Sequence, residues 1–270
     1  MTTLRTIQEL HDALAPQRPD HELGLVPTMG ALHEGHRALL EAARAENDVV
    51  VMSAFVNPAQ FGPGEDLERY PRDEESDARL AEEWGVDHLF SPSVAQMYPE
   101  GFDTWVEVGD VAGGLEASAR PGHFRGVATI CLKLFNLVRP SRAYFGEKDA
   151  QQAAVIRQLV RDLNVPLEIR VVPTVRDTDG VAVSSRNAYL SADEREAARA
   201  LPHALAAGAE AYGNGGDASG AAGALLAAEP RLEPEYVEVA RLDGRTYLLA
   251  AVRVGRTRLI DNVVLEGDNA

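Results

Sequence analysis

Two histidines, His33 and His36, stand where a short apolar run gives way to a helical pattern. Residues 23–26 are typical of a buried strand, Pro27 and Gly30 mark a loop, and apolar residues then recur at helical spacing. The first turn of a helix offers N–H groups without helical partners and a partial positive charge, which together bind anions. Imidazoles there can donate hydrogen bonds to phosphate oxygens. The spacing therefore predicts a nucleoside triphosphate site of the His-x-Gly-His kind.

The same histidines could be exposed surface residues, or two ligands of a zinc ion, which would need further ligands. The single cysteine is Cys131, and the other histidines are scattered along the chain. Only one residue separates Glu34 from His36, so the zinc-protease pattern His-Glu-x-x-His is not present. We therefore expect no metal site built from protein ligands.

Two further positive elements lie far along the chain. Lys148, one of two lysines, follows a short apolar run and opens a helical pattern. Ser184, Ser185 and Arg186 combine hydroxyls with a guanidinium, groups that suit phosphate oxygens. Taken alone, the lysine fits a solvated helix, and the serines fit a helix cap beside a surface arginine. In combination with the histidine loop, they predict three positive elements around one triphosphate.

Composition limits the partners and the compartment. The 270-residue chain has 26 Lys+Arg against 42 Asp+Glu, a formal net charge of −16. Such a charge argues against nucleic acid or an anionic membrane as a partner. One cysteine excludes an intramolecular disulfide. Without a hydrophobic signal core or a long apolar segment, we expect a cytoplasmic protein.

Strand and helix patterns alternate over the first two thirds of the chain. Thr6 and Glu9 form a possible capping box inside an amphipathic stretch, and residues 48–56 are a β-branched run typical of a central parallel strand. The expected helices cover residues 3–14, 36–46, 72–84 and 122–138, and a further helix opens with the motif at residues 146–152 and runs to residue 164. The expected strands cover residues 23–26, 48–56, 86–90, 143–145 and 167–172. This alternation predicts an α/β fold with a Rossmann-like parallel sheet.

The pattern changes after residue 175. Residues 176–189 are polar and rich in turn residues, and residues 191–229 are Ala-rich helix interrupted at residues 213–216. Residues 236–240, 246–254 and 257–264 alternate like a small antiparallel sheet. We therefore expect a nucleotide-binding catalytic domain over residues 1–175 and a smaller α+β lid domain over residues 176–270.

At this point the sequence resembles the pantothenate synthetase family, ATP-dependent ligases that join pantoate to β-alanine. The likeness runs through nearly all of residues 20–200 and is general beyond them. The motifs that carry it occupy residues 27–36, 55–58, 70–72, 120–124, 145–149 and 184–187. So many motifs in one order are highly specific.

The resemblance implies attack of the pantoate carboxylate on Mg²⁺-bound ATP, followed by attack of β-alanine on the pantoyl adenylate. It implies His36 as the acid or hydrogen-bond donor at the departing charge, with His33, Lys148 and Arg186 as the other catalytic residues. It places pantoate and β-alanine at Gln60 and Gln152, and adenine against Val175. The implied ATP-binding residues are Met29, Gly30, Ala31, Leu32, His33, Glu34, Gly35, His36, Gly146, Glu147, Lys148, Asp149, Val175, Val183, Ser184, Ser185 and Arg186. A cytoplasmic homodimer is also implied.

Three positions depart from the family pattern: Ala59, Ala150 and Val183 are smaller than the residues usual there. No polar catalytic group is lost, so the departures concern substrate fit. Two alternatives remain, a nucleotidyltransferase that leaves the nucleotide on its product and a nucleotide-binding regulator without turnover. The paired glutamines argue against the first, and the complete set of phosphate-binding residues argues against the second.

Overall fold

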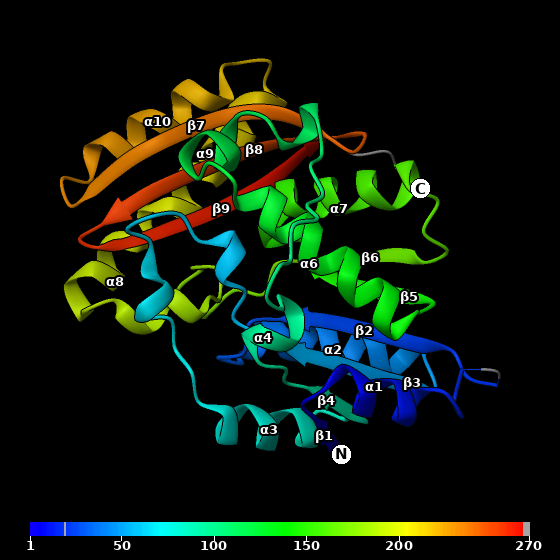
Figure 1. Ribbon diagram of the computed structural model, residues 1–270. Helices are drawn as coiled ribbons and strands as arrows, with labels where there is room; N and C mark the ends of the chain where they lie inside the picture. The colour runs from blue at the N-terminus through cyan, green and yellow to red at the C-terminus, as the bar shows by residue number, and fades with distance from the viewer. Residues whose placement is uncertain (19, 267–270) are drawn as a thin grey trace. The chain divides into compact units, whose positions relative to one another are not determined.

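The computed structural model describes residues 1–18 and 20–266, and Figure 1 shows their course. The described chain forms two compact units. The first comprises Met1–Gly146 together with Val155–Val172. The second comprises Glu147–Ala154 and the chain from Pro173 onward. The short segment that carries Lys148 therefore belongs to the second unit, although it directly follows a strand of the first.

A six-stranded parallel sheet forms the centre of the first unit, in the order β1-β4-β3-β2-β5-β6. From β2 the chain winds outward through β3 to β4, which pairs with β1, and then returns to the other side of β2 with β5 and β6. The strands are β1 (Thr2–Leu4), β2 (Leu23–Thr28), β3 (Val49–Ala54), β4 (His88–Phe90), β5 (Arg142–Gly146) and β6 (Glu168–Val172). The expected Rossmann-like sheet is confirmed, and ligands of such sheets bind at the carboxyl ends of the strands.

Helices cover both faces of this sheet. Leu25 and Val51 pack with α1, α6 and the part of α7 that lies in the first unit, whereas their neighbours Val26 and Met52 pack with α2 and α3. Successive side chains of a strand point to opposite faces, so burial of both faces explains the unbroken apolar runs. The helices and short 3₁₀ turns of the first unit are α1 (Ile7–Leu14), α2 (Glu34–Glu46), η1 (Pro58–Gln60), η2 (Asp66–Glu68), α3 (Glu74–Glu83), α4 (Val94–Met97), η3 (Asp110–Ala112), α5 (Leu115–Ala119), α6 (His123–Val138) and, in part, α7 (Ala150–Asp162).

The amino terminus differs from its expected structure. The predicted helix over residues 3–14 begins only at Ile7, and Leu4 instead pairs with Phe90 at the edge of the sheet. Thr6 and Glu9 do form the predicted capping box. Because this capping box fixes the start of the helix at Ile7, the residues before Thr6 are not helical, and Thr2–Leu4 extend as β1.

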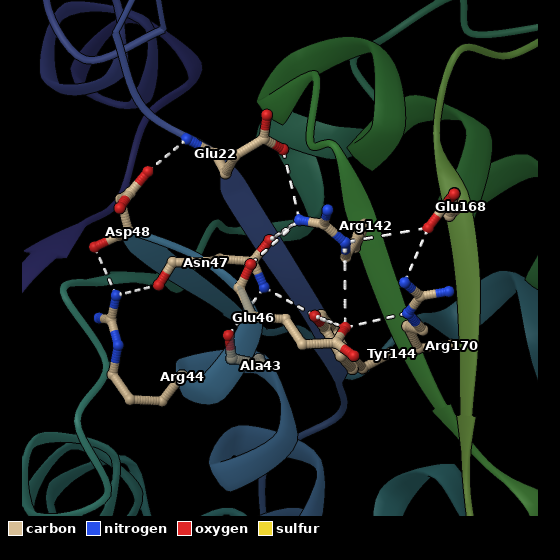
Figure 2. Close-up of polar contacts among 10 residues, drawn as sticks. All are labelled: Glu22, Ala43, Arg44, Glu46, Asn47, Asp48, Arg142, Tyr144, Glu168 and Arg170. Atoms are coloured by element: carbon tan, nitrogen blue, oxygen red, sulfur yellow. Dashed lines mark hydrogen bonds and ion pairs between the residues drawn. The ribbon is translucent and has the colours of Figure 1, made fainter.

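A polar network ties the carboxyl-terminal end of α2 to β5 and β6 (Figure 2). The Glu46 carboxylate accepts hydrogen bonds from the Tyr144 hydroxyl at 2.8 Å and from Nε of Arg170 at 2.9 Å. These two hydrogen bonds lower the pKa of Glu46. Nη1 of Arg142 donates to the Glu46 carbonyl at 3.0 Å and to Oδ1 of Asn47 at 3.2 Å. The helix that begins at the histidine loop is thereby anchored at its far end.

An antiparallel three-stranded sheet, in the order β7-β8-β9, forms the second unit together with the helices that pack on it. Apolar residues of the helices, among them Leu201 and Leu226, pack against Leu248 and Val252 of the central strand. The elements are η4 (Glu147–Asp149), the first turns of α7, η5 (Ser185–Tyr189), α8 (Ala192–Ala198), α9 (Ala200–Gly213), α10 (Ala218–Ala228), β7 (Leu232–Leu242), β8 (Arg245–Val254) and β9 (Thr257–Glu266). The predicted small sheet is confirmed, although β7 is longer than predicted. None of the helices in the described part of the chain is long and apolar enough to cross a membrane.

Candidate nucleotide and acid site

The two histidines lie at the start of α2, directly after β2. His33 is the N-cap residue, and its Nδ1 accepts a hydrogen bond from the Gly35 N–H at 3.1 Å. Nδ1 of His36 accepts from the His33 N–H at 3.3 Å, and the two rings lie 4.0 Å apart between centroids. Because both Nδ1 atoms accept, the neutral rings carry their proton on Nε2. Both Nε2–H groups are therefore donors suited to an anion. The helix begins two residues before the predicted start.

A buried carboxylate fixes the backbone of the loop between β2 and α2. Gly30 and Ala31 both have positive φ, 77° and 52°, which is costly for alanine. Asp77 of α3 compensates, because its two oxygens accept from the N–H groups of Ala31 at 2.9 Å and Leu32 at 2.8 Å. Burial raises the pKa of Asp77, while these two hydrogen bonds act in the opposite direction. Asp77 was not predicted, because it is one of several acidic residues on α3.

Gln60 lies in η1, just beyond β3, and is buried. Its Nε2 lies 2.9 Å from Sδ of Met29, and its Oε1 accepts from Nδ2 of Asn57 at 3.1 Å. The structure thus joins Met29 of the predicted ATP site to Gln60 of the predicted pantoate site. Asn57 is itself held by the Tyr98 hydroxyl at 2.9 Å and by the carbonyl of Gly126 in α6 at 3.1 Å.

A second buried polar group lies against the backbone of Gln60. Nδ1 of His123 lies 2.8 Å from the Gln60 carbonyl, and Nε2 of His123 lies 3.1 Å from Nη1 of Arg120. Since a guanidinium only donates, Nε2 accepts and Nδ1 carries the proton. Arg120 also pairs with Glu65 at 2.7 Å. Burial, and then the charge of Arg120, lower the pKa of His123 to about 4.

Asn57, Arg120 and His123 were not among the predicted site residues, although all three lie in the motifs that carry the family resemblance. The only signal available in the sequence was a histidine directly after Pro121-Gly122. Its partner Gln60 lies 63 residues earlier, which local spacing cannot reveal.

In the second unit, Lys148 lies in η4 and forms an ion pair with Asp149 at 3.7 Å. Asn262 of β9 donates from Nδ2 to the carbonyls of Glu147 and Lys148, both at 2.9 Å. Gln152 lies one turn further on, in the first turns of α7, and is half-buried.

Val175, Val183 and the Ser-Ser-Arg motif belong to one continuous piece of the second unit. The Val183 N–H donates to the Val175 carbonyl at 2.9 Å, which closes a hairpin. Oγ of Ser184 then accepts from the Arg186 N–H at 3.3 Å and caps η5. Val175, which was expected to lie against the adenine, is thus paired through its backbone with Val183 of the predicted ATP-binding set.

The second unit therefore contains Glu147, Lys148, Asp149 and the segment from Val175 to Arg186. The first unit contains the two histidines and the contact between Met29 and Gln60. Gly146 ends β5 in the first unit. Among residues 1–18 and 20–266, no group of three or more His, Cys, Asp or Glu could hold a metal ion.

Residues 2–264 match the family described as Pantoate-beta-alanine ligase. The chain is 53% identical to the pantothenate synthetase of Roseiflexus castenholzii, with 98% of this chain and 100% of the relative covered. It is similar in structure to the pantothenate synthetase of Thermus thermophilus, with a TM-score of 0.93, 49% identity and coverage of 98% and 99%. The pantoate-beta-alanine ligase of Francisella tularensis, solved in complex with beta-gamma ATP and beta-alanine, has a TM-score of 0.84 and 34% identity over the full length of both chains.

Proposed function

This chain belongs to the pantoate-beta-alanine ligase family, so it is a carbon–nitrogen ligase that uses ATP to join pantoate to β-alanine, and we propose which residues carry each step. In the family reaction, the pantoate carboxylate attacks the α-phosphorus of ATP, which yields pantoyl adenylate and pyrophosphate. The amine of β-alanine then attacks the acyl carbon, displaces AMP and loses a proton to give pantothenate.

The histidine loop acts on the phosphates in the first step. Nε2–H of His36 donates to the oxygen on which charge develops as pyrophosphate departs, and His33 donates beside it. The N–H groups at the start of α2 add to this field. Donors that are fixed before charge develops stabilise the transition state without reorganising. Lys148 and Arg186 complete the phosphate contacts from the second unit.

Gln60 orients pantoate. Its Oε1 accepts a hydrogen bond from Asn57, so the NH₂ group is the part of the amide that binds a ligand. One N–H reaches Met29, and the second can donate to a hydroxyl or carboxylate oxygen of pantoate. A neutral amide orients a carboxylate without the strong pairing that would reduce its nucleophilicity. Gln152 supplies a second amide for pantoate or β-alanine.

The 2.9 Å contact between Nε2 of Gln60 and Sδ of Met29 is the observation that carries this assignment. Met29 opens the loop that leads to the two histidines, so an acid held by Gln60 lies beside the nucleotide loop. This adjacency is what direct attack of a carboxylate on a nucleotide phosphate requires.

A divalent metal is needed by ATP-using ligases, and we propose Mg²⁺ bound to the ATP substrate. The described residues provide no ligand cluster of their own for a metal ion, and Mg²⁺ commonly binds through substrate phosphates and water. We also propose, from the family, a cytoplasmic homodimer in which residues 176–270 close as a lid over the adenylate.

Pyrophosphate exchange tests the proposal. Labelled pyrophosphate should enter ATP when enzyme, Mg²⁺ and pantoate are present and β-alanine is absent. Adding β-alanine should yield AMP and pantothenate in equal amounts. Exchange that needs a phosphorylated acceptor instead of pantoate would support a nucleotidyltransferase, and a regulator would show no exchange. An analogue of pantoate without hydroxyls should exchange poorly, because unpaired buried amide donors cost about 1–3 kcal/mol each.

A further inference from the structure

Two neighbouring polar residues of β9, Asp261 and Asn262, are almost fully buried in the second unit, with 2% and 5% of their surface exposed. Burial of a carboxylate and an amide on a strand is costly unless each has partners. Neither residue belongs to a motif discussed above. Both nevertheless contact segments that carry predicted nucleotide-binding residues.

Asn262 holds the Lys148 segment through its backbone. A single amide nitrogen, Nδ2, donates to the consecutive carbonyls of Glu147 and Lys148 at 2.9 Å each. From β8, Nη1 of Arg245 adds a hydrogen bond to Oε1 of Glu147 at 3.1 Å. These contacts fix η4 on the small sheet, so the orientation of the Lys148 side chain depends on β9.

Asp261 holds the other segment. Its oxygens accept from Nη1 and Nη2 of Arg176 at 2.6 and 3.0 Å, a bidentate pair that is strong and directional. The carboxylate, with 1% of its side chain exposed, raises the pKa of Arg176. Arg176 also bridges to Ala182 within the hairpin that joins Val175 to Val183, and Nη2 donates to the Asn262 carbonyl at 3.4 Å.

We propose that Asp261 and Asn262 are positioning residues that fix the Lys148 segment and the hairpin leading to Arg186 on one strand. Both segments then reach ATP as one body, with their spacing set by β9. The role rests on the proposed function, because it assumes that Lys148 and Arg186 contact the phosphates. Asp261 and Asn262 themselves act only through the residues that they hold.

The test is a double-mutant cycle on the rate of pantoate-dependent pyrophosphate exchange. Lys148→Ala should lower the rate strongly, and Asn262→Ala alone should lower it by about 10- to 100-fold, the usual effect of losing a residue that orients a ligand-binding group. If Asn262 acts through Lys148, the double variant should be little slower than Lys148→Ala alone. Multiplicative losses would overturn the proposal, because they would mean that Asn262 acts independently of the lysine.

Asn262→Asp sharpens the test, since it keeps the shape but turns a carboxylate oxygen toward two carbonyl oxygens. It should be slower than Asn262→Ala. The matched control is Asn214→Asp at an exposed helix end, which makes the same chemical change and should exchange at the unaltered rate. Should Asn262→Asp fail to fold, as judged by circular dichroism, the alanine cycle still decides. Full exchange by Lys148→Ala would instead contradict the proposed function.

Discussion

Oδ2 of Asp77 accepts a hydrogen bond from the backbone N–H of Ala31 at 2.9 Å, across 46 residues of sequence. The pair holds a non-glycine residue at a φ of 52° in the loop that leads to the histidines. Non-glycine residues that the surrounding structure holds in such a strained conformation are concentrated at functional sites. The carboxylate of α3 therefore sets the path by which the chain enters α2.

Asp77→Asn should lower the rate of pantoate-dependent pyrophosphate exchange by about 10- to 100-fold, because an amide NH₂ would face one of the two loop N–H groups and displace the histidines. Steady-state exchange assays at saturating ATP and pantoate would measure the loss. Asp103→Asn, at an exposed position of the same unit, is the control. Equal rates for the two variants would show that Asp77 does not position the loop.

Two substitutions of His36 distinguish the roles of its two ring nitrogens. His36→Asn keeps an acceptor near the place of Nδ1, which receives the His33 N–H, but removes the Nε2 donor. We expect a loss of about 10²–10³ in adenylation rate, typical of one lost transition-state donor. His36→Gln places an amide nearer to Nε2 and should retain more activity. Single-turnover adenylation measures both, and a slower glutamine variant would contradict the assigned donor.

Sequence patterns predicted the elements whose signal is local. The apolar run of β2, the helical spacing after His36 and the alternation of β8 and β9 each place a whole element, because burial imposes a period on neighbouring residues. β7 was predicted only in part, since Pro234 and the irregular pairing beside it interrupt the alternation. The extension of β1 depends on pairing with β4, far along the chain.

Residues that hold the site through long-range contacts could not be predicted. Asn262 bonds to Lys148 across 114 residues, and its surroundings in sequence show only a strand. The same contacts place the Lys148 segment in the second unit, whereas its position after β5 suggested the first. Motifs that contain the catalytic residues are local in sequence, but the residues that orient them come from distant segments that only the fold brings into contact.

Gly126→Ala should damage the pantoate side of the site. A Cβ at Gly126 would lie 2.2 Å from the carbonyl oxygen of Ala59, so η1 and Gln60 must move. The KM for pantoate should rise about tenfold or more, with a smaller change for ATP, because a displacement of about 1 Å can cost 10²-fold. Gly223→Ala in α10 has open space and is the control. Unchanged pantoate kinetics in Gly126→Ala would show that the position of η1 does not matter.

Tyr144→Phe should reduce stability and leave activity intact. Its buried hydroxyl donates to Glu46 and accepts from Nδ2 of Asn47 at 2.7 Å. Removing it should lower the free energy of unfolding by about 1–3 kcal/mol. The network lies at the opposite end of α2 from the histidines, about 20 Å away for 13 residues. Urea denaturation measures the stability, and a large loss of exchange in the folded variant would show that this end is coupled to the site.

His123 should make stability depend on pH. Its pKa is about 4 in the folded chain, below the usual value near 6.5, because of burial and then Arg120. The hydrogen bond to the Gln60 carbonyl, and then Glu116 and Glu65, act in the opposite direction. Between pH 6.5 and 4 the unfolded chain binds a proton here that the folded chain does not. The free energy of unfolding should therefore fall as pH decreases through this window, by about 1.4 kcal/mol per pH unit from this residue.

The measurement compares urea denaturation of the parent protein with that of His123→Gln from pH 7.5 to pH 4.5. Other groups titrate in both proteins, so the contribution of His123 is the difference between their slopes. The glutamine variant should be less stable at pH 7.5, because it loses the bonded ring between Gln60 and Arg120, but its stability should fall less steeply with decreasing pH. If His123→Gln keeps the parent slope, the ring does not stay neutral through this range, and its assignment as a donor to the Gln60 carbonyl and an acceptor from Arg120 is wrong.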